Sequence, residues 1–337
     1  MTGRLLTLGA LAAATALASC ENAEPQNHAT RASDVTDTAT AVQGVQTGYS
    51  VSGARFVRNV IGFGGPESVR YDPELDMYFI SCIVGYGSAK DNNGYIVRVK
   101  ADKPDSGVVL AHGGVNGVML DGPKGMAIHG DTLWVADINI LRGFNKRTGA
   151  VLANIDFTPY GAVQLNDVAV GPDGQVRVTD TGIIMGPYGV QHVGPDHIFV
   201  LGPVGTITAP QQGPDLHQPN GITWDSAGKR WIVLSFDRLD GQVAELPLDM
   251  STRKVIWRSK VTTQLDGVEM LPDHSIMFTS WADSSIHVLR DSTDRKVIRQ
   301  VPVPADIGVD TRRHRLAIPL SMLGNVQLWN IDSLRSR

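Results

Sequence analysis

A pattern that recurs six times between residues 66 and 320 is the feature that most restricts the fold of this chain. Each copy opens on a small or polar residue, continues in a short apolar run, turns at Gly, Asp or Pro, and ends in a second apolar run. The second residues of the six openings are Glu67, Lys124, Asn166, Asn220, Asp266 and Asp306. The repeat length is about 47 residues, which is typical of β-propeller blades.

The repeats consist of short β-branched and aromatic segments separated by turns, and they contain no convincing amphipathic helix. The 36 Gly and 18 Pro residues fit a turn-rich β fold. We therefore predict an all-β, six-bladed β-propeller over residues 54–337, with a seven-bladed propeller and a large β-sandwich as the alternatives. Residues 55–61 are expected to add an outer strand to the last blade and close the ring, which removes exposed sheet edges.

The first 53 residues differ from the repeats. A short, positively charged start is followed by the apolar stretch 5–17, which ends in Leu17-Ala18-Ser19-Cys20. This ending resembles a bacterial lipobox, so we expect residues 1–19 to be a lipoprotein signal peptide and Cys20 to carry the lipid. An ordinary secretory signal is the alternative. Residues 20–53 have almost no large apolar groups and are expected to form a flexible linker. The protein would then be a lipoprotein of the bacterial cell envelope that faces the periplasm and meets the membrane only through its lipid.

The composition excludes several other classes of protein. A net charge of −4 over 337 residues argues against a nucleic-acid binder, which needs a strongly basic face. Two cysteines are too few for a disulfide-stapled scaffold, and Cys82, in the largely apolar stretch 78–83, is expected to be a buried structural thiol. The sequence has no Gly-x-Ser-x-Gly motif, which argues against an α/β-hydrolase.

The second residues of the six openings define a candidate site. The innermost strand of each propeller blade runs along the central channel, so the residues that open these strands meet at one mouth of the channel. Unpaired carboxylates in a narrow channel repel each other and lose hydration, and a hard cation removes that cost. Glu67, Asn166, Asn220 and Asp266 offer only oxygen, which favours Ca²⁺ over zinc or copper, although another divalent metal would also fit.

The motifs around these residues resemble those of the senescence marker protein/gluconolactonase/luciferin-regenerating enzyme-like propellers. The resemblance covers about residues 60–330 and depends on Pro66-Glu67-Ser68, Leu165-Asn166-Asp167, Pro219-Asn220-Gly221 and Leu265-Asp266-Gly267. It implies one divalent metal, usually calcium, held by Glu67, Asn220 and Asp266, with Asn166 as a further ligand or a contact to substrate. It also implies hydrolysis of lactones, or of phosphotriesters in a related branch.

We therefore expect a metal-dependent hydrolase of a small lactone or ester, in which calcium polarises the ring carbonyl and Asp266 activates water. Asn166, Lys124 and His217 are expected to contact the substrate. Lys124 departs from an all-oxygen ring, and an ion pair with Asp306 or Glu67 that replaces the metal is an open alternative. The alternative function is a non-catalytic, envelope-anchored propeller that binds a protein or a glycan.

Overall fold

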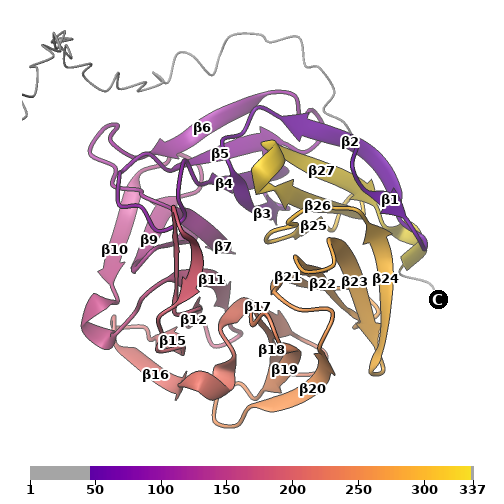
Figure 1. Ribbon diagram of the computed structural model, residues 1–337. Helices are drawn as coiled ribbons and strands as arrows, with labels where there is room; N and C mark the ends of the chain where they lie inside the picture. The colour runs from indigo at the N-terminus through magenta and orange to yellow at the C-terminus, as the bar shows by residue number, and fades with distance from the viewer. Residues whose placement is uncertain (1–45, 335–337) are drawn as a thin grey trace, which may run out of the picture. The chain divides into compact units, whose positions relative to one another are not determined.

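Six antiparallel sheets surround a central axis, as Figure 1 shows for the computed structural model, which describes residues 46–334. The predicted six-bladed β-propeller is therefore confirmed. The first three blades are β3 (Pro66–Asp72), β4 (Met77–Cys82), β5 (Tyr95–Lys100) and β6 (Gly107–His112); β7 (Pro123–His129), β8 (Thr132–Asp137), β9 (Ile140–Asn145) and β10 (Val151–Asp156); and β11 (Leu165–Val170), β12 (Val176–Asp180), β15 (His197–Leu201) and β16 (Ile207–Gln212).

The other three blades follow the same order from the axis outward. They are β17 (Pro219–Asp225), β18 (Arg230–Ser235), β19 (Gly241–Leu246) and β20 (Lys254–Ser259); β21 (Leu265–Met270), β22 (Ile276–Ser280), β23 (Ser285–Arg290) and β24 (Thr293–Arg299); and β25 (Gly308–Asp310), β26 (Arg315–Leu320) and β27 (Asn325–Asn330). Short 3-10 helices lie in the connections: η2 (Thr158–Tyr160), η3 (Pro214–Leu216), η4 (Ser321–Leu323) and η5 (Asp332–Leu334).

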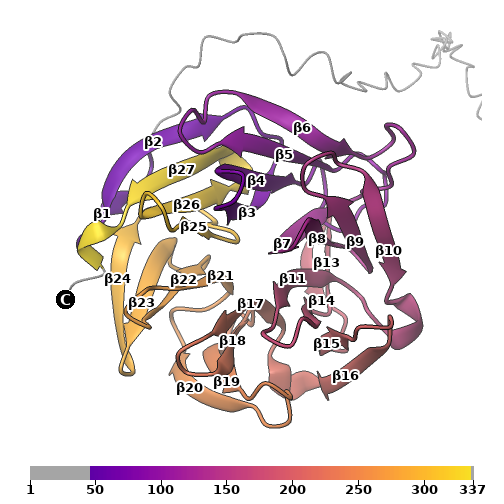
Figure 2. The same ribbon diagram turned by 180° about the vertical axis from the view of Figure 1, so that it is seen from behind.

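A strand from the N-terminal side of the propeller completes the last blade. β2 (Arg55–Ile61) pairs with β27 along its length, from Arg55 opposite Asn330 to Ile61 opposite Asn325. Figure 2 shows this strand beside β27, at the join between the two ends of the ring. The predicted closure by residues 55–61 is confirmed, and it leaves the last blade with four strands like the others.

The propeller also includes residues that precede the predicted boundary at residue 54. β1 (Tyr49–Ser50) pairs with Arg299 and Ile298 and adds a fifth strand to the blade of β21–β24. Part of the predicted 20–53 linker therefore belongs to the fold. The predicted signal peptide (1–19) and the lipid-bearing Cys20 lie outside the described residues. Within residues 46–334, no helix is both long and apolar enough to cross a bilayer.

Six apolar clusters hold the ring together, one at each contact between neighbouring blades. For example, Phe278 and Leu289 of one blade pack against Ile232 and Val243 of the preceding blade. Full burial of each such side chain contributes about 1.5–3 kcal/mol to folding. Cys82 belongs to one of these clusters and is fully buried, and burial raises the pKa of its thiol to about 12. It is the structural thiol that the sequence predicted.

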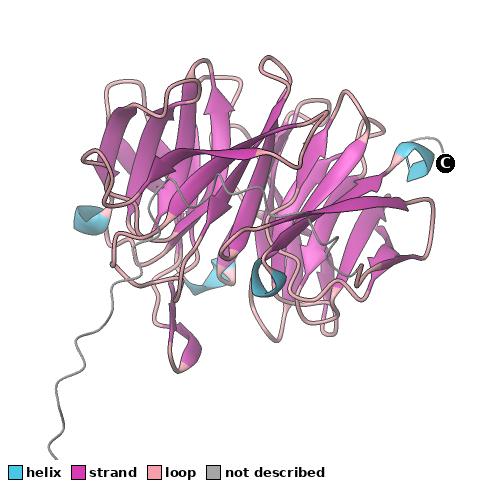
Figure 3. Ribbon diagram, turned by 90° about the horizontal axis from the view of Figure 1, so that it is seen from above, coloured by secondary structure: helices cyan, strands magenta, loops and turns pink. Residues whose placement is uncertain are grey.

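The blade topology gives the propeller two different faces, which are visible from the side in Figure 3. Strands alternate in direction within each blade. The connections that lead into the innermost strands, and those between the second and third strands, therefore share one face, which we call the mouth face. The remaining turns form the opposite base face. An additional hairpin, β13 (Ile183–Gly186) with β14 (Gly189–His192), lies in a mouth-face connection between β12 and β15.

A buried histidine links two outer strands of the fifth blade. The Nδ1 atom of His287 lies 2.8 Å from Asp294, and its Nε2 atom lies 3.1 Å from Asp283, which also pairs with Lys296. Burial alone lowers the pKa of His287, but the hydrogen bonds to Asp283 and Asp294 outweigh it and raise this pKa above its ordinary value. The protonated ring therefore stabilises the blade.

This cluster predicts a pH dependence of stability. Because the pKa of His287 is higher in the folded than in the unfolded state, its contribution is complete below about pH 6.5 and disappears as the pH rises through the raised value. The free energy of unfolding lost in His287→Asn should therefore decrease as the pH is raised from below about 6.5 into the alkaline range, by up to about 1.4 kcal/mol per pH unit. Chemical denaturation measures this loss, and His274→Asn, in an exposed turn, is the control. A loss that is constant over this pH range would contradict the prediction.

Candidate functional site

The six residues singled out by the repeat lie at equivalent places in the six blades. Five of them are the second residues of innermost strands, and the sixth lies two residues before β25. All are buried, with exposed fractions between 1% and 9%. We call this set the mouth ring: Glu67, Lys124, Asn166, Asn220, Asp266 and Asp306.

The local backbone at the mouth ring is irregular in the same way in five blades. The register of each innermost strand shifts directly at its start, as between Leu265 and Val268 in β21. Such bulges bend the strand and redirect its side chains. A glycine follows the ring residue where neighbouring strands come close: a Cβ on Gly221 would lie 2.2 Å from the Asp266 carbonyl oxygen. The motif Asn-Gly or Asp-Gly is therefore a packing requirement as well as a source of polar groups.

The carboxyl groups of the ring act on one another. Burial raises the pKa of Glu67 well above its ordinary value, and the charges of Asp266 and Asp306 raise it further. Burial and the charge of Asp306 raise the pKa of Asp266 to about 8. Burial also raises the pKa of Asp306. Three separate blades thus bring acidic groups together where ionisation is costly.

Lys124 forms neither of the two ion pairs left open by the sequence. Its Nζ atom donates to the carbonyl oxygens of Gly87, at 2.9 Å, and Gly122, at 3.3 Å. Among the residues that the structure describes, no carboxylate lies within ion-pair distance of this ammonium. Burial lowers the pKa of Lys124, although the charges of Glu67, Asp137 and Asp266 oppose that shift. The lysine therefore stabilises the connection 83–94 and does not pair directly with any of the ring carboxylates.

Buried oxygen atoms without partners occur in four residues of the mouth ring. Within residues 46–334, Asp306 Oδ1 lacks a hydrogen-bond partner, and so do oxygens of three others, Glu67 Oε2, Asn220 Oδ1 and Asp266 Oδ1. A buried acceptor left unpaired costs about 1–3 kcal/mol, more when it is charged. These three residues are the metal ligands that the family resemblance implies. The described residues contain no group of three or more His, Cys, Asp and Glu side chains suited to a metal ion, whereas this set combines two carboxylates with an amide.

Asn166 and His217 are the remaining predicted site residues. Asn166 is buried at the start of β11, in the ring position that the sequence assigned to it. His217 lies in a mouth-face connection, in the left-handed conformation that ends η3. Its Nδ1 atom lies 3.0 Å from Asp237, and its side chain is partly exposed. Contacts of Asn166, Lys124 and His217 with a substrate stay predictions.

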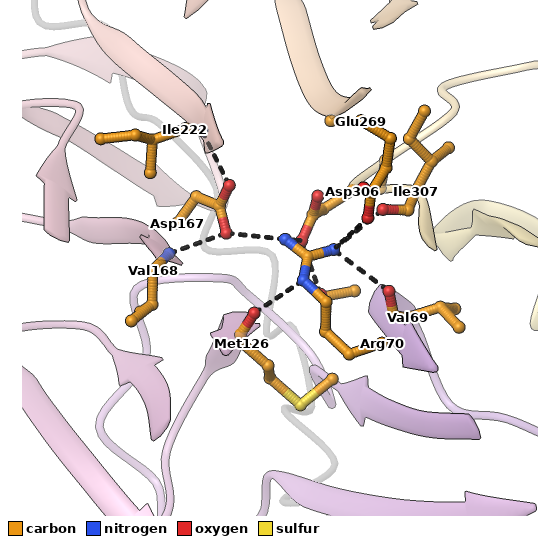
Figure 4. A network of polar contacts seen from close by, with 12 residues as sticks. Val69, Arg70, Met126, Asp167, Val168, Ile222, Glu269, Asp306 and Ile307 are labelled. Carbon is orange, nitrogen blue, oxygen red and sulfur yellow. Dashed lines mark hydrogen bonds and ion pairs between the residues drawn. The ribbon is translucent and has the colours of Figure 1, made fainter. Parts of the chain in front are cut away.

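Arg70 and three carboxylates form a second polar layer, which the sequence analysis missed (Figure 4). Arg70 follows Glu67 by three residues on β3, and its Nη2 atom lies 2.9 Å from Asp306 and 3.1 Å from Asp167. Its Nη1 atom donates to the Ile307 carbonyl at 2.8 Å and lies 3.9 Å from Glu269. We call these four residues the Arg70 network: Arg70, Asp167, Glu269 and Asp306.

The Arg70 network separates the ring acids into two groups. Burial opposes the charged guanidinium, but Asp306 and Asp167 raise the pKa of Arg70 above its ordinary value, so it stays a cation. Asp306 uses its Oδ2 atom for both Arg70 and the Ser68 hydroxyl. Arg70 therefore neutralises Asp306, whereas no cationic side chain within residues 46–334 forms an ion pair with Glu67 or Asp266.

A buried, oxygen-rich ring at one mouth of a six-bladed propeller is the class of site that the fold and these contacts define. Residues 80–309 match the SMP-30/gluconolactonase/LRE-like region, and the chain belongs to this family. The resemblance seen in the sequence motifs is thereby confirmed.

Solved structures agree with the assignment of the fold. A gluconolactonase from Xanthomonas campestris is 13% identical with a TM-score of 0.60, over 86% of this chain and 99% of its own. Regucalcin from Agrobacterium tumefaciens, a calcium-binding protein, is 14% identical with a TM-score of 0.61, over 81% of this chain and 93% of its own. At these identities the two structures establish the fold alone. No curated protein matches the chain.

Proposed function

We propose that the protein is a metal-dependent hydrolase of lactones or related esters, with the mouth ring as its active site. The observation that carries the proposal is the set of buried, unpartnered oxygens on Glu67, Asn220 and Asp266. Membership of a family whose name includes gluconolactonase supports it, as does the calcium binding named for regucalcin.

Glu67, Asn220 and Asp266 would hold the metal, with Asn166 as a further ligand. Hard oxygen donors of this kind suit Ca²⁺. When bound, calcium supplies a Lewis acid that polarises a carbonyl oxygen. A nearby positive charge also lowers the pKa values that burial and mutual repulsion raise in Glu67 and Asp266, so a bound cation would favour the ionised forms of these two side chains.

Asp266 is the proposed general base. Its carboxylate has two oxygens, of which Oδ1 lacks a hydrogen-bond partner among the described residues; one oxygen would hold the metal, and the other would take a proton from water. In the reaction, the water O–H bond breaks toward Asp266 while the water oxygen bonds to the lactone carbonyl carbon. The ring C–O bond then breaks, and the departing alkoxide oxygen takes the proton back from Asp266. The products are a hydroxy acid and the unchanged side chain.

Turnover of a lactone panel tests this proposal. The full chain is incubated with sugar lactones, acyl-substituted lactones and a phosphotriester, each with Ca²⁺ and with a chelator. We expect hydrolysis of at least one lactone that depends on Ca²⁺. No turnover of any panel member, together with no effect of Ca²⁺ on stability, would instead favour the non-catalytic binder of a protein or glycan.

Calcium is also expected to raise the melting temperature of the protein. A ligand that binds only the folded state stabilises it by about 2.7 kcal/mol at a concentration 100 times its Kd. Glu67→Gln should lose most of this stabilisation, because the amide keeps the shape but removes one charge. Asp102→Asn, in an exposed base-face turn, is the matched control and should keep it. Equal shifts in the two variants would exclude Glu67 as a ligand.

We also infer that the propeller is anchored in the cell envelope through a lipid on Cys20. The apolar stretch 5–17 and the sequence Leu17-Ala18-Ser19-Cys20 support this inference. Mass spectrometry of the mature N-terminal peptide should find the chain beginning at a diacylated Cys20. An unmodified cysteine in that peptide would exclude the anchor.

A further inference from the structure

Exposed apolar side chains are unevenly distributed over the propeller. Most of the large ones lie in mouth-face connections, and Tyr188, at the tip of the β13–β14 hairpin, is 90% exposed. They occur in the connections of several blades around the ring. The set is Tyr86, Val115, Met119, Tyr160, Ile184, Tyr188, Val193, Leu239, Val261, Met322 and Leu323.

The base face has the opposite character. Its turns contain exposed charged residues such as Glu74, Lys103, Arg147, Asp249 and Arg312. Val204 and Leu248 are the large apolar residues exposed in the described base-face turns. Scattered exposed apolar residues are normal on a soluble protein, but their concentration on the mouth face indicates a surface that binds an apolar partner.

The chain enters the propeller on the mouth face. Tyr49 lies opposite Arg299, the last residue of β24, and the segment that follows β24 leads to the start of the next innermost strand. Residues 46–48 therefore lie on the mouth-face side of the fifth blade. Cys20, the proposed site of the lipid, precedes Tyr49 by 29 residues in the sequence, and a linker of that length reaches about 30 Å, which would keep the mouth face near the membrane.

We propose that the mouth face docks on a lipid bilayer, with Tyr188, Leu239, Val261 and Met322 entering the interfacial region. The apolar side chains are spread around the ring rather than gathered at one point, which fits a flat apolar partner better than a small ligand. Tyr also suits a membrane interface, because its ring is apolar and its hydroxyl reaches water. The lipid on Cys20 would hold the chain at the bilayer, and the apolar mouth face would add a second contact that fixes the orientation of the propeller.

The attraction is apolar rather than electrostatic. The mouth-face connections contain more acidic than basic side chains, with Lys90, Arg238 and Lys260 as the basic ones. Docking should therefore occur on zwitterionic lipids and change little with salt. It does not depend on the proposed hydrolysis, because docking is measured without any substrate.

Fluorescence quenching tests the orientation. Tyr188→Cys and Val204→Cys are made separately in the full chain and labelled with a thiol-reactive fluorophore. The two positions belong to the same blade and are 90% and 87% exposed, but they lie on opposite faces. Cys82 is fully buried, and the unsubstituted chain gives the background labelling. Vesicles of phosphatidylcholine containing a spin-labelled quencher lipid are then added.

We expect quenching at position 188 at least about five times stronger than at position 204. Combining Leu239→Ser and Val261→Ser should reduce the quenching at position 188, and both residues are too exposed for this change to disturb the core. Equal quenching at the two positions would mean a propeller tethered without a preferred face, and would overturn the proposal. No quenching at either position would also overturn it, and would assign the apolar side chains to a protein partner or an apolar substrate.

Discussion

Asp266→Asn is expected to lower kcat/KM for a lactone substrate by about 10²- to 10⁴-fold, the range typical of removing a general base. Asparagine has almost the same shape and retains an oxygen, so the mouth ring should keep its packing. The amide cannot take a proton from water, however, and this is the role proposed for the carboxylate of Asp266. Because substrate binding does not require that proton transfer, most of the loss should appear in kcat rather than in KM.

Two measurements separate loss of the base from loss of the metal. Asp102→Asn, the same substitution in an exposed base-face turn, should retain wild-type turnover. The calcium-induced rise in melting temperature should decrease in Asp266→Asn about as much as in Glu67→Gln, so turnover is compared at a Ca²⁺ concentration that saturates each variant. Retention of more than about half of the wild-type kcat would remove Asp266 from the mechanism.

The fold was predictable because each blade repeats the same local pattern. Apolar runs, turns and repeat length are local properties of the sequence, and a ring of blades must close, which assigned residues 55–61 to the last blade. β1 was not predictable, because Tyr49 and Ser50 form only a two-residue strand in a polar segment. Its pairing depends on an available edge at β24, a property of the folded ring and not of those two residues.

The site was predictable to the extent that strand position alone determines it. Residues that open innermost strands must converge, so Glu67, Asn220 and Asp266 could be placed from their motifs. The contacts of Lys124 could not, because its partners are carbonyl oxygens, which every residue carries. Arg70 was missed for a related reason. Arg70 follows a bulge at the start of β3. Side chains of a regular strand point alternately to its two faces, and a bulge interrupts this alternation, so the face to which Arg70 points could not be predicted from the sequence.

The Arg70 network contains buried carboxylates whose desolvation should destabilise the protein when the arginine is removed. The guanidinium is 14% exposed and lies next to Asp167 and Asp306, whose side chains are almost completely buried. Burial raises the pKa of Glu269, the third carboxyl group, to about 7. Asp167 and Asp306 were taken out of water on folding, and Arg70 is the positive charge that offsets their desolvation.

Arg70→Met is therefore expected to lower the free energy of unfolding by about 3–5 kcal/mol, as measured by chemical denaturation. Methionine fills much of the space but leaves Asp167 and Asp306 uncompensated. Arg258→Met is the control: Arg258 is 53% exposed and lies 3.3 Å from Asp240, and loss of such a surface pair costs no more than about 1 kcal/mol. The double variant Arg70→Met/Asp306→Asn should lose less stability than Arg70→Met alone, because one of the unpaired charges is gone. If Arg70→Met loses no more stability than the control, or if the second substitution adds to the loss, then the arginine does not neutralise these acids, and packing of its side chain accounts for its burial.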